Sequence, residues 1–405
     1  MPDRSLRVLM LAPQPFFIER GTPIAVRAAA ETLAKAGHQI DLLVYHLGDD
    51  IDLPNNVRLV RIPKVLGVKR MRPGPTVSKL RCLVGFYRAA KKLVKQDDYD
   101  LVHAVEDGVF VALRLKSKHG LPFVYDMDSL MSEQVAEKPG VGKAAAALFA
   151  VLETAAVRNA IHCLCVCPHL KEVAKRDVPD APDEHLTVLT DFPLVDPMPA
   201  KGDVAERVQR AHDDGRLVAA YVGNLEPYQG VGDMLDAARL LLDGQSDAAE
   251  RVRLHIYGGP ADAMDAMRRE YADLADAGVV EFCGSIPVSR LGEVLHSSDI
   301  LLSPRKVGTN TPMKLYGYLA SGKPVLATSI LSHTQVLSDS HAELVEPNPN
   351  ALAEGLTRLI DEDPRRRRLG RAGAKLVEQK HSRAAFERTL TGVYRAIGTA
   401  LSAQD

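Results

Sequence analysis

The chain has 405 residues, more than one hydrophobic core usually covers, so we expect two domains of roughly 200 residues each. Apolar residues make up 46% and charged residues 25%, as in an ordinary globular protein. The 51 Lys and Arg nearly balance the 52 Asp and Glu, which argues against a nucleic-acid partner. No apolar run approaches the ~20 residues that span a bilayer and no signal peptide is evident, so we expect a cytoplasmic protein.

Short apolar runs alternate with helical patterns through the first half of the chain. Residues 7–12 predict a buried strand, 23–36 predict a helix that ends at Gly37, and 39–45 predict the next strand. Further strands are predicted at 57–62, 101–105, 122–126 and 161–167. This strand–helix alternation indicates a mostly parallel sheet covered by helices.

Three prolines interrupt the rhythm in the segment 191–199, which predicts a linker. A second strand–helix series follows, and the last 25 residues, 381–405, have the pattern of one amphipathic helix. The strands of the second series are predicted at 217–222, 252–257, 279–283, 300–302 and 324–327. The expected fold is α/β, with two Rossmann-like, doubly wound domains in tandem.

The cysteines do not predict a disulfide scaffold, because five are too few for a chain of this length. Cys163, Cys165 and Cys167 alternate along an apolar stretch, so in a strand they would share one face. We interpret them as small buried hydrophobes. A metal site is the alternative, although no second Cys/His pair stands at ligand spacing.

Two helix starts follow the same design, at 19–23 and at 308–312. Thr22 and Thr311 are each predicted to cap a helix, with the following proline in the first helical position. Free backbone N–H groups at such an end, with the helix dipole behind them, favour an anion. The alternative is a well-capped helix with solvated neighbours.

Basic residues accompany both helix starts. Arg20 stands beside the first, and Arg305, Lys306 and Lys314 surround the second. Three cations at one helix start favour a phosphate there.

Carboxylates follow two predicted strands of the first half. Glu106 and Asp107 come after 101–105, where one could act as a base for an acceptor hydroxyl and the other could cap the next helix. Asp126 and Asp128 follow the next strand. An Asp-x-Asp pair can bind a metal with a diphosphate, but carboxylates at strand ends are also frequent helix caps.

Several common signatures are missing or incomplete. No G-x-G-x-x-G, H-E-x-x-H or G-x-S-x-G occurs. The stretch 317–324 nearly matches a P-loop, but Pro324 replaces the Ser/Thr that would hold magnesium. Gly322 is better explained as the end of a helix.

From Leu53 to Gln96 there are 12 Lys/Arg and no Asp/Glu. The plain interpretation is a solvated face. The alternative is a surface that contacts an anionic membrane through 58–95 or receives a phosphate-bearing acceptor, with the predicted helix 77–95 at its centre.

The order and spacing of several motifs resemble glycosyltransferase family 4, the retaining enzymes with the GT-B fold. The resemblance covers nearly the whole chain and is carried by the stretches 220–230, 255–260, 280–287 and 313–325, together with Gly37-His38. It implies an acceptor-binding domain at 1–190, a linker at 191–200 and a donor-binding domain at 201–380. The helix at 381–405 would pack back toward the first domain.

The sequence departs from the family pattern at polar positions. The usual Glu-x7-Glu pair matches Thr309 and Gly317, so this chain resembles a variant without that pair. The usual diphosphate-binding Arg and Lys match Asn224 and Gln229. The usual active-site His matches Asp128, or Asp126 if the alignment shifts.

The resemblance implies transfer of a sugar from a nucleotide diphosphate sugar to a hydroxyl of a glycan or lipid-linked acceptor, in polysaccharide or glycolipid synthesis. It implies no metal and no cofactor besides that co-substrate, and a protein at the inner face of the membrane. The expected catalytic residues are Asp128, Glu106, Arg305 and Lys306, with the last two replacing the lost positive charge. The expected donor-binding residues are Gly21, Thr22, Gly223, Asn224, Gln229, Gly230, Gly258, Arg305, Lys306, Thr311, Pro312, Lys314 and Leu315.

Two other functions fit the same architecture. A non-hydrolysing sugar-nucleotide epimerase would change the sugar without an acceptor. A non-catalytic protein that binds a sugar nucleotide or a partner enzyme would explain the missing Glu pair.

Overall fold

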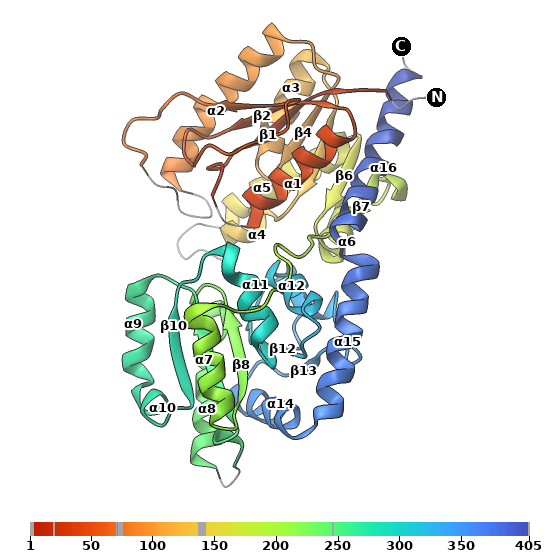
Figure 1. Ribbon diagram of the computed structural model, residues 1–405. Helices are drawn as coiled ribbons and strands as arrows, with labels where there is room; N and C mark the ends of the chain where they lie inside the picture. The colour runs from red at the N-terminus through yellow and green to blue at the C-terminus, as the bar shows by residue number, and fades with distance from the viewer. Residues whose placement is uncertain are drawn as a thin grey trace. The chain divides into compact units, whose positions relative to one another are not determined.

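The computed structural model describes residues 4–18, 21–69, 71, 76–136, 143–244 and 247–403. The chain divides into two compact units, drawn in Figure 1. Unit 1 contains Met1–Thr190 and Phe386–Asp405, and unit 2 contains Asp191–Ala385.

Unit 1 is built on a seven-stranded parallel sheet in the order β3-β2-β1-β4-β5-β6-β7. The strands are β1 (Arg7–Ala12), β2 (Gln39–Val44), β3 (Val57–Arg61), β4 (Leu101–Val105), β5 (Phe123–Met127), β6 (His162–Cys165) and β7 (Leu186–Val188). Central strands such as β4 are buried along their whole length, which explains why their sequences are largely apolar. The chain reverses its direction of winding between β1 and β4, where ligands of such sheets bind.

Helices cover both faces of this sheet (Figure 1). They are α1 (Gly21–Lys35), α2 (Val77–Gln96), α3 (Gly108–His119), α4 (Met131–Ala136), α5 (Lys143–Asn159), α6 (Pro168–Asp177), the short 3₁₀ helix η1 (Asp183–His185) and most of α16 (Arg383–Ser402). The ring of Tyr394 on α16 is fully buried, and its hydroxyl lies 2.8 Å from Nδ1 of His103 on β4. The end of the chain is therefore part of the core of unit 1.

Unit 2 repeats the design with a six-stranded parallel sheet in the order β10-β9-β8-β11-β12-β13. The strands are β8 (Leu217–Val222), β9 (Val252–Tyr257), β10 (Val280–Gly284), β11 (Ile300–Ser303), β12 (Val325–Thr328) and β13 (Glu343–Val345). The helices are α7 (Gly202–Asp213), η2 (Pro227–Gln229), α8 (Val231–Asp243), η3 (Asp247–Ala249), α9 (Ala261–Glu270), α10 (Ala272–Asp276), α11 (Val288–Ser297), α12 (Lys314–Ala320), α13 (Leu331–Thr334), α14 (Pro349–Asp361) and α15 (Asp363–Lys380). Its winding reverses between β8 and β11.

The predicted α/β fold with two doubly wound sheets is confirmed, and each predicted strand occurs within two residues of its expected ends. The prediction missed β7 and β13. Each has only three residues and lies at the edge of its sheet, so neither leaves a long apolar run in the sequence.

The alternating cysteines pack as predicted. Cys163, Cys165 and Cys167 are buried in the hydrophobic core of unit 1, and burial raises the pKa of the Cys163 thiol to about 12. Among the described helices, none combines the length and the hydropathy needed to cross a bilayer.

Candidate active site

The turn after β4 carries two of the predicted carboxylates into a buried position. Glu106 has a backbone φ of +47°, a left-handed conformation that is rare and costly for a residue with a β-carbon. Its N–H donates to the carbonyl of Asp126 and its own carbonyl accepts from Val109. The strained turn fixes Glu106 at the carboxyl edge of the sheet, directly before α3.

Charge around this turn is mainly negative. Asp107 occupies the N-cap position of α3 but makes no capping hydrogen bond; its Oδ1 lies 3.0 Å from the ammonium of Lys79 on α2. The Ser129 hydroxyl donates to Oε1 of Glu106 at 2.9 Å. Burial raises the pKa of Glu106, and the neighbouring Asp107 carboxylate raises it further. A carboxyl group with a raised pKa at a sheet edge is suited to exchange a proton with a bound hydroxyl.

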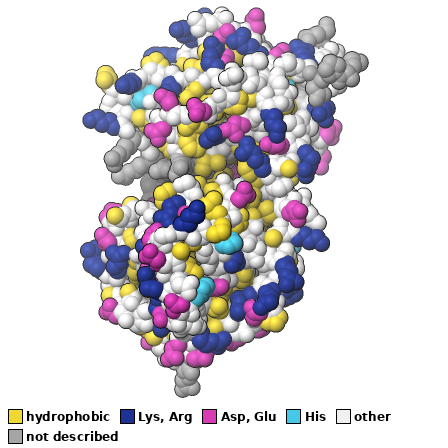
Figure 2. Space-filling view, viewed as in Figure 1, with side chains coloured by type: hydrophobic (Ala, Val, Ile, Leu, Met, Phe, Trp, Pro, Cys, Tyr) yellow, Lys and Arg dark blue, Asp and Glu magenta, His cyan; other side chains and the backbone are white. Residues whose placement is uncertain are grey.

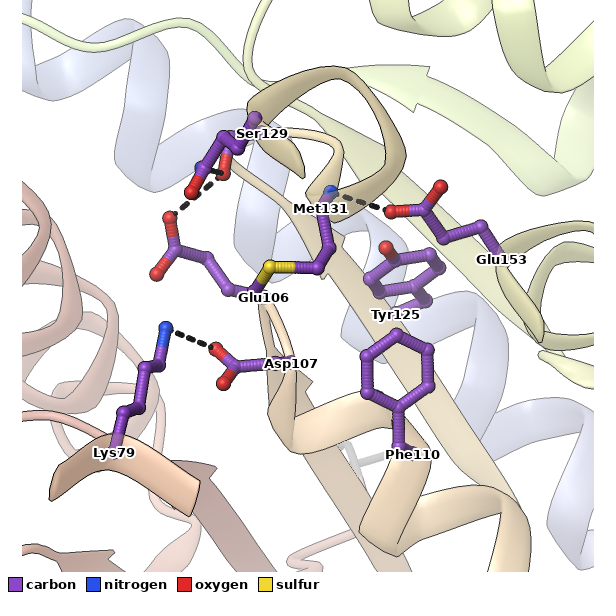
Figure 3. Close-up of a pocket in the computed structure, with 9 residues that line it drawn as sticks. Lys79, Glu106, Asp107, Phe110, Tyr125, Ser129, Met131 and Glu153 are labelled. Atoms are coloured by element: carbon purple, nitrogen blue, oxygen red, sulfur yellow. Dashed lines mark hydrogen bonds and ion pairs between the residues drawn. The ribbon is translucent and has the colours of Figure 1, made fainter. Parts of the chain in front are cut away.

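Figure 3 shows the pocket around these groups, with Glu106, Asp107 and Lys79 on one side and Glu153 on the other. Glu153 reaches from α5 and accepts from the backbone N–H of Met131 at 2.6 Å, at the start of α4. Nothing in the local sequence marks Glu153, which lies 22 residues from its partner.

The two aspartates after β5 differ in their surroundings. Oδ2 of Asp126 lies 3.0 Å from Nε2 of His103, whose side chain is fully buried. A carboxylate can only accept, so Nε2 carries the proton and Nδ1 accepts from the Tyr394 hydroxyl. Asp126 is thus part of a buried network, while Asp128 lies one residue beyond β5 and is partly exposed.

The predicted cap at Thr22 is wrong. Helix α1 begins at Gly21, so Thr22 and Pro23 lie inside its first turn. Proline is tolerated there because the first four N–H groups of a helix have no intrahelical acceptor. Glu19 and Arg20 lie outside the described residues.

In unit 2, three glycines allow loops to approach one another at the carboxyl edge of the sheet. Gly258 follows β9 with φ +109°, and a β-carbon on it would collide with the carbonyl of Gly223 after β8. Gly230, with φ +70°, would in the same way collide with the carbonyl of Pro304 after β11. The predicted glycines thus bring the ends of β8, β9 and β11 together.

Lys314 is the central cation of this edge. Its Nζ donates to Oε1 of Gln229 at 3.1 Å and lies 4.2 Å from the centre of the Tyr221 ring. Burial, together with the charge of nearby Arg305, lowers the pKa of Lys314 to about 7. Among the described residues, the structure records no ion pair for Lys314. This edge therefore carries a partly buried lysine for which the described residues provide no ion pair, and an anionic ligand would supply its counter-charge.

Arg305 and Lys306 are engaged differently. The Arg305 guanidinium donates to the carbonyls of Val307 and Asn310 in its own loop, and it lies over the ring of Tyr228 at 5.3 Å. The Lys306 ammonium pairs with Asp233 on α8 at 2.9 Å. The sequence did not predict the ion pair of Lys306, because Asp233 lies 73 residues away along the chain.

The predicted helix start at 311–312 needs correction. Helix α12 begins at Lys314, and the carbonyl of Pro312 accepts from the N–H of Leu315 in a tight first turn. Thr311 is buried, and its hydroxyl accepts from Gln335 instead of capping the helix. The side chain of Leu315 is fully buried in a core cluster with Leu319, and its part in donor binding stays a prediction.

Asn224, the remaining candidate, is exposed and makes local contacts. Its amide donates to the Tyr228 hydroxyl at 3.4 Å, and its Oδ1 accepts from the N–H of Glu226. No group of three or more His, Cys, Asp or Glu suited to a metal ion occurs among the described residues.

The surface of α2 combines exposed apolar and basic side chains. Val77, Leu80 and Val84 are 77%, 64% and 49% exposed, and Arg81 fixes the neighbouring loop by donating to the carbonyl of Leu66, itself 87% exposed. We call these four apolar side chains the α2 apolar patch. Further along the same helix, the exposed basic residues are Arg88, Lys92 and Lys95. Figure 2 shows basic and apolar side chains interspersed on the unit that carries α2.

Other parts of the predicted basic stretch do not join this surface. Arg58 pairs with Asp41 and Asp97, and Arg61 donates to backbone carbonyls and to Asp50. Residues 70 and 72–75 lie outside the described residues.

Two doubly wound parallel units with polar carboxyl edges define the GT-B class of sugar transferases, and comparison with known proteins agrees. A family model described as "Glycosyl transferases group 1" matches residues 204–376, and one described as "Glycosyl transferase 4-like domain" matches residues 20–190. The chain belongs to this group 1, family 4 type of glycosyltransferase, and it is an enzyme of that class.

Relatives and solved structures support this assignment. A phosphatidyl-myo-inositol mannosyltransferase from Mycolicibacterium smegmatis is 24% identical over 88% of this chain and 86% of its own length. A D-inositol 3-phosphate glycosyltransferase from Corynebacterium glutamicum is 29% identical over 38% of this chain and 37% of its own length. A sucrose-phosphate synthase from Thermosynechococcus elongatus matches with a TM-score of 0.77 at 19% identity, covering 98% of this chain and all of that one. HepE from Anabaena, solved in complex with UDP, matches with a TM-score of 0.72 at 13% identity, covering 96% and 100%.

Proposed function

We propose that this glycosyltransferase moves a sugar from a nucleotide diphosphate sugar to a hydroxyl acceptor with retention of configuration and without a metal ion. The observation that carries the proposal is Lys314, a partly buried lysine at the carboxyl edge of the unit 2 sheet that forms no ion pair with the described residues. A leaving diphosphate develops negative charge as the sugar bond breaks, and a fixed cation in a partly dry site stabilises that charge.

The neighbouring groups have supporting roles in this proposal. Gly223 and Gly258 keep the edge clear of side chains, so that a phosphate can approach the backbone. Arg305 and Lys306 add positive potential, even though both have protein partners. In unit 1, the N-terminal turn of α1, with Gly21 and Thr22, offers free N–H groups that suit an anion.

Unit 1 would handle the acceptor. Glu106 accepts the proton of the attacking hydroxyl as the new glycosidic bond forms, and its raised pKa makes it a stronger base for that step. Asp128, the partly exposed aspartate after β5, orients the transferred sugar or the hydroxyl.

The acceptor belongs, in our proposal, to glycolipid or polysaccharide synthesis at the inner face of the cell membrane. The α2 apolar patch and the basic residues beyond it suit a surface with anionic headgroups. The names of the two relatives, an inositol-lipid mannosyltransferase and an inositol-phosphate glycosyltransferase, support a phosphate-bearing acceptor.

A thermal-denaturation panel tests the donor site. UDP, GDP, ADP, TDP and their sugars are compared with and without EDTA, with UDP first because HepE was solved with it. A ligand that binds only the folded protein at a hundred times its dissociation constant adds about 2.7 kcal/mol of stability. Stabilisation by one nucleotide class regardless of EDTA supports the proposal, whereas a response to none would favour a non-catalytic protein of this family.

Retention is tested on the product. Once donor and acceptor are known, the anomeric coupling constant of the newly formed linkage is measured by NMR and compared with that of the donor sugar. An inverted product would exclude the proposed stereochemistry, and a changed sugar nucleotide without any transfer would identify an epimerase.

A further inference from the structure

The loop 304–312 between β11 and α12 carries the cations Arg305 and Lys306. A buried polar network packs against this loop and fixes its backbone. His333 on α13 is fully buried between the ends of β11 and β12. Its Nδ1 lies 2.8 Å from the carbonyl of Thr328, and its Nε2 lies 3.0 Å from the hydroxyl of Ser303. The carbonyl only accepts, so Nδ1 carries the proton and Nε2 accepts from Ser303.

The network continues into the loop itself. The Thr328 hydroxyl donates to the carbonyl of Arg305, which fixes the first part of the loop to β12. Ser303, Thr328 and His333 are each fully buried, and burial lowers the pKa of His333 to about 4. The imidazole therefore stays neutral near pH 7, and its hydrogen-bonding pattern stays fixed.

The side chain of Gln335 holds the far part of the loop. The amide nitrogen of Gln335, just past α13, donates to the carbonyl of Thr309 at 2.8 Å and to the hydroxyl of Thr311 at 2.9 Å. Between the two attachments, the Arg305 guanidinium bridges the carbonyls of Val307 and Asn310. The loop is thus tied at both ends to one short segment, 328–335.

We propose that His333 and Gln335 are positioning residues, which hold the loop 304–312 in the conformation that binds the diphosphate of the donor. This inference rests on the proposed function of the unit 2 edge. Both side chains act through the loop and are not placed against the ligand. Their contribution is preorganisation, because a loop ordered before binding loses less conformational entropy when the anion arrives.

The alternative is that the network only stabilises unit 2. The two roles predict different results, because a stabilising network would affect folding and leave the intrinsic affinity for phosphate unchanged. A positioning network would affect loop order and phosphate affinity in the folded enzyme.

The test compares Gln335→Ala with Thr334→Ala, a neighbouring exposed residue of α13 that makes only a 3.3 Å contact with its own helix. Dissociation constants are measured by calorimetry for pyrophosphate, UDP and uridine, and hydrogen exchange is followed in the loop. For Gln335→Ala we expect about tenfold weaker binding of pyrophosphate and UDP, unchanged uridine binding and faster exchange at 307–311. Thr334→Ala should match the unchanged enzyme.

Thr328→Val provides a second variant, since it removes the hydroxyl that holds the other end of the loop while keeping the shape of the side chain. The same selective loss is expected. Equal pyrophosphate affinity in both loop variants and in Thr334→Ala would overturn the positioning role. If the unchanged enzyme binds neither pyrophosphate nor UDP, the proposed donor site fails, and the inference fails with it.

Discussion

The carboxyl edges of the two sheets are built alike but carry opposite charge. In unit 1, Glu106, Asp107 and Asp126 gather at the edge, with Lys79 as the recorded cationic partner of the turn. In unit 2, Lys314, Arg305 and Lys306 gather there, with Asp233 as the partner of one of them. The parallel scaffold supplies the same position twice, and the residues that follow the strands decide what each edge can bind.

The opposite charges of the two edges suit them to different steps of the proposed reaction. A cationic edge stabilises a leaving diphosphate, and an anionic edge accepts a proton from a hydroxyl. The residues that matter most are therefore Lys314 and Glu106, which are partly buried and whose charges are incompletely compensated by the described residues. Fully paired residues such as Arg58 and Asp41 serve the fold. The predictions below test this difference, beginning with the largest effect.

Replacing the central cation should have the largest effect. Lys314→Met keeps the side-chain length but removes the charge, and we expect a loss of ~300-fold in kcat/KM. Thermal stability should stay the same or rise, because a partly buried cation without an ion pair to the described residues is removed. Lys375→Met, at an exposed position of α15, is the control. Full activity in Lys314→Met would place the diphosphate elsewhere.

Removing the buried carboxyl of unit 1 should have the next largest effect. Glu106→Gln keeps the shape and should lower kcat by about 100-fold, the usual scale for loss of a general base. Because the pKa of Glu106 is raised, the acid limb of the kcat profile should lie above the ordinary Glu value of about 4.3, and the variant should lack that limb. Glu133→Gln on α4 is the control. An unchanged acid limb in Glu106→Gln would assign it to another group.

Donor affinity should depend on pH through Lys314, whose pKa lies at about 7. A diphosphate favours the charged form, so affinity for UDP should be highest below pH 7 and about tenfold weaker at pH 8, where roughly one tenth of the lysine is charged. His333, with its pKa lowered to about 4, and Tyr221, with its pKa raised by burial, do not titrate in that window.

The stability of the free enzyme should change in the opposite direction. The unfolded chain keeps the ordinary lysine pKa of 10.5, so it binds more protons than the folded protein between pH 7 and that value. This site's contribution to the free energy of unfolding should therefore rise with pH across the window. Calorimetry and thermal scans from pH 6 to 9, with Lys314→Met as reference, measure both effects. Parallel curves for the two proteins would remove Lys314 as their source.

The smallest effect is expected at the surface of α2. Arg88→Gln with Lys92→Gln should reduce binding to vesicles containing anionic lipid by about fivefold per charge removed, and should not change binding to neutral vesicles. Arg268→Gln with Arg269→Gln, on α9 of unit 2, is the matched control. Equal losses in both pairs would show that net charge, and not the α2 surface, determines membrane binding.

Much of the fold could be predicted from local sequence patterns. The run 101–105 is apolar except for His103 and is followed by a carboxylate, which is enough to predict a buried strand with a polar residue at its edge. The same logic located β8 and β9 and the glycines that follow them. The cap predictions at Thr22 and Thr311 failed because helix ends depend on backbone geometry that a Thr-Pro pair does not fix.

The sequence alone determined that this protein is a pair of parallel α/β sheets with charged residues after the strands, because burial periodicity and strand ends are local properties. Only the tertiary structure decided which of those residues remain available for chemistry. It buried Leu315 in the core, gave Lys306 a partner 73 residues away and left Lys314 against the neutral amide of Gln229. Such pairings depend on the order of strands in the sheet, which brings distant segments together and which no local pattern records.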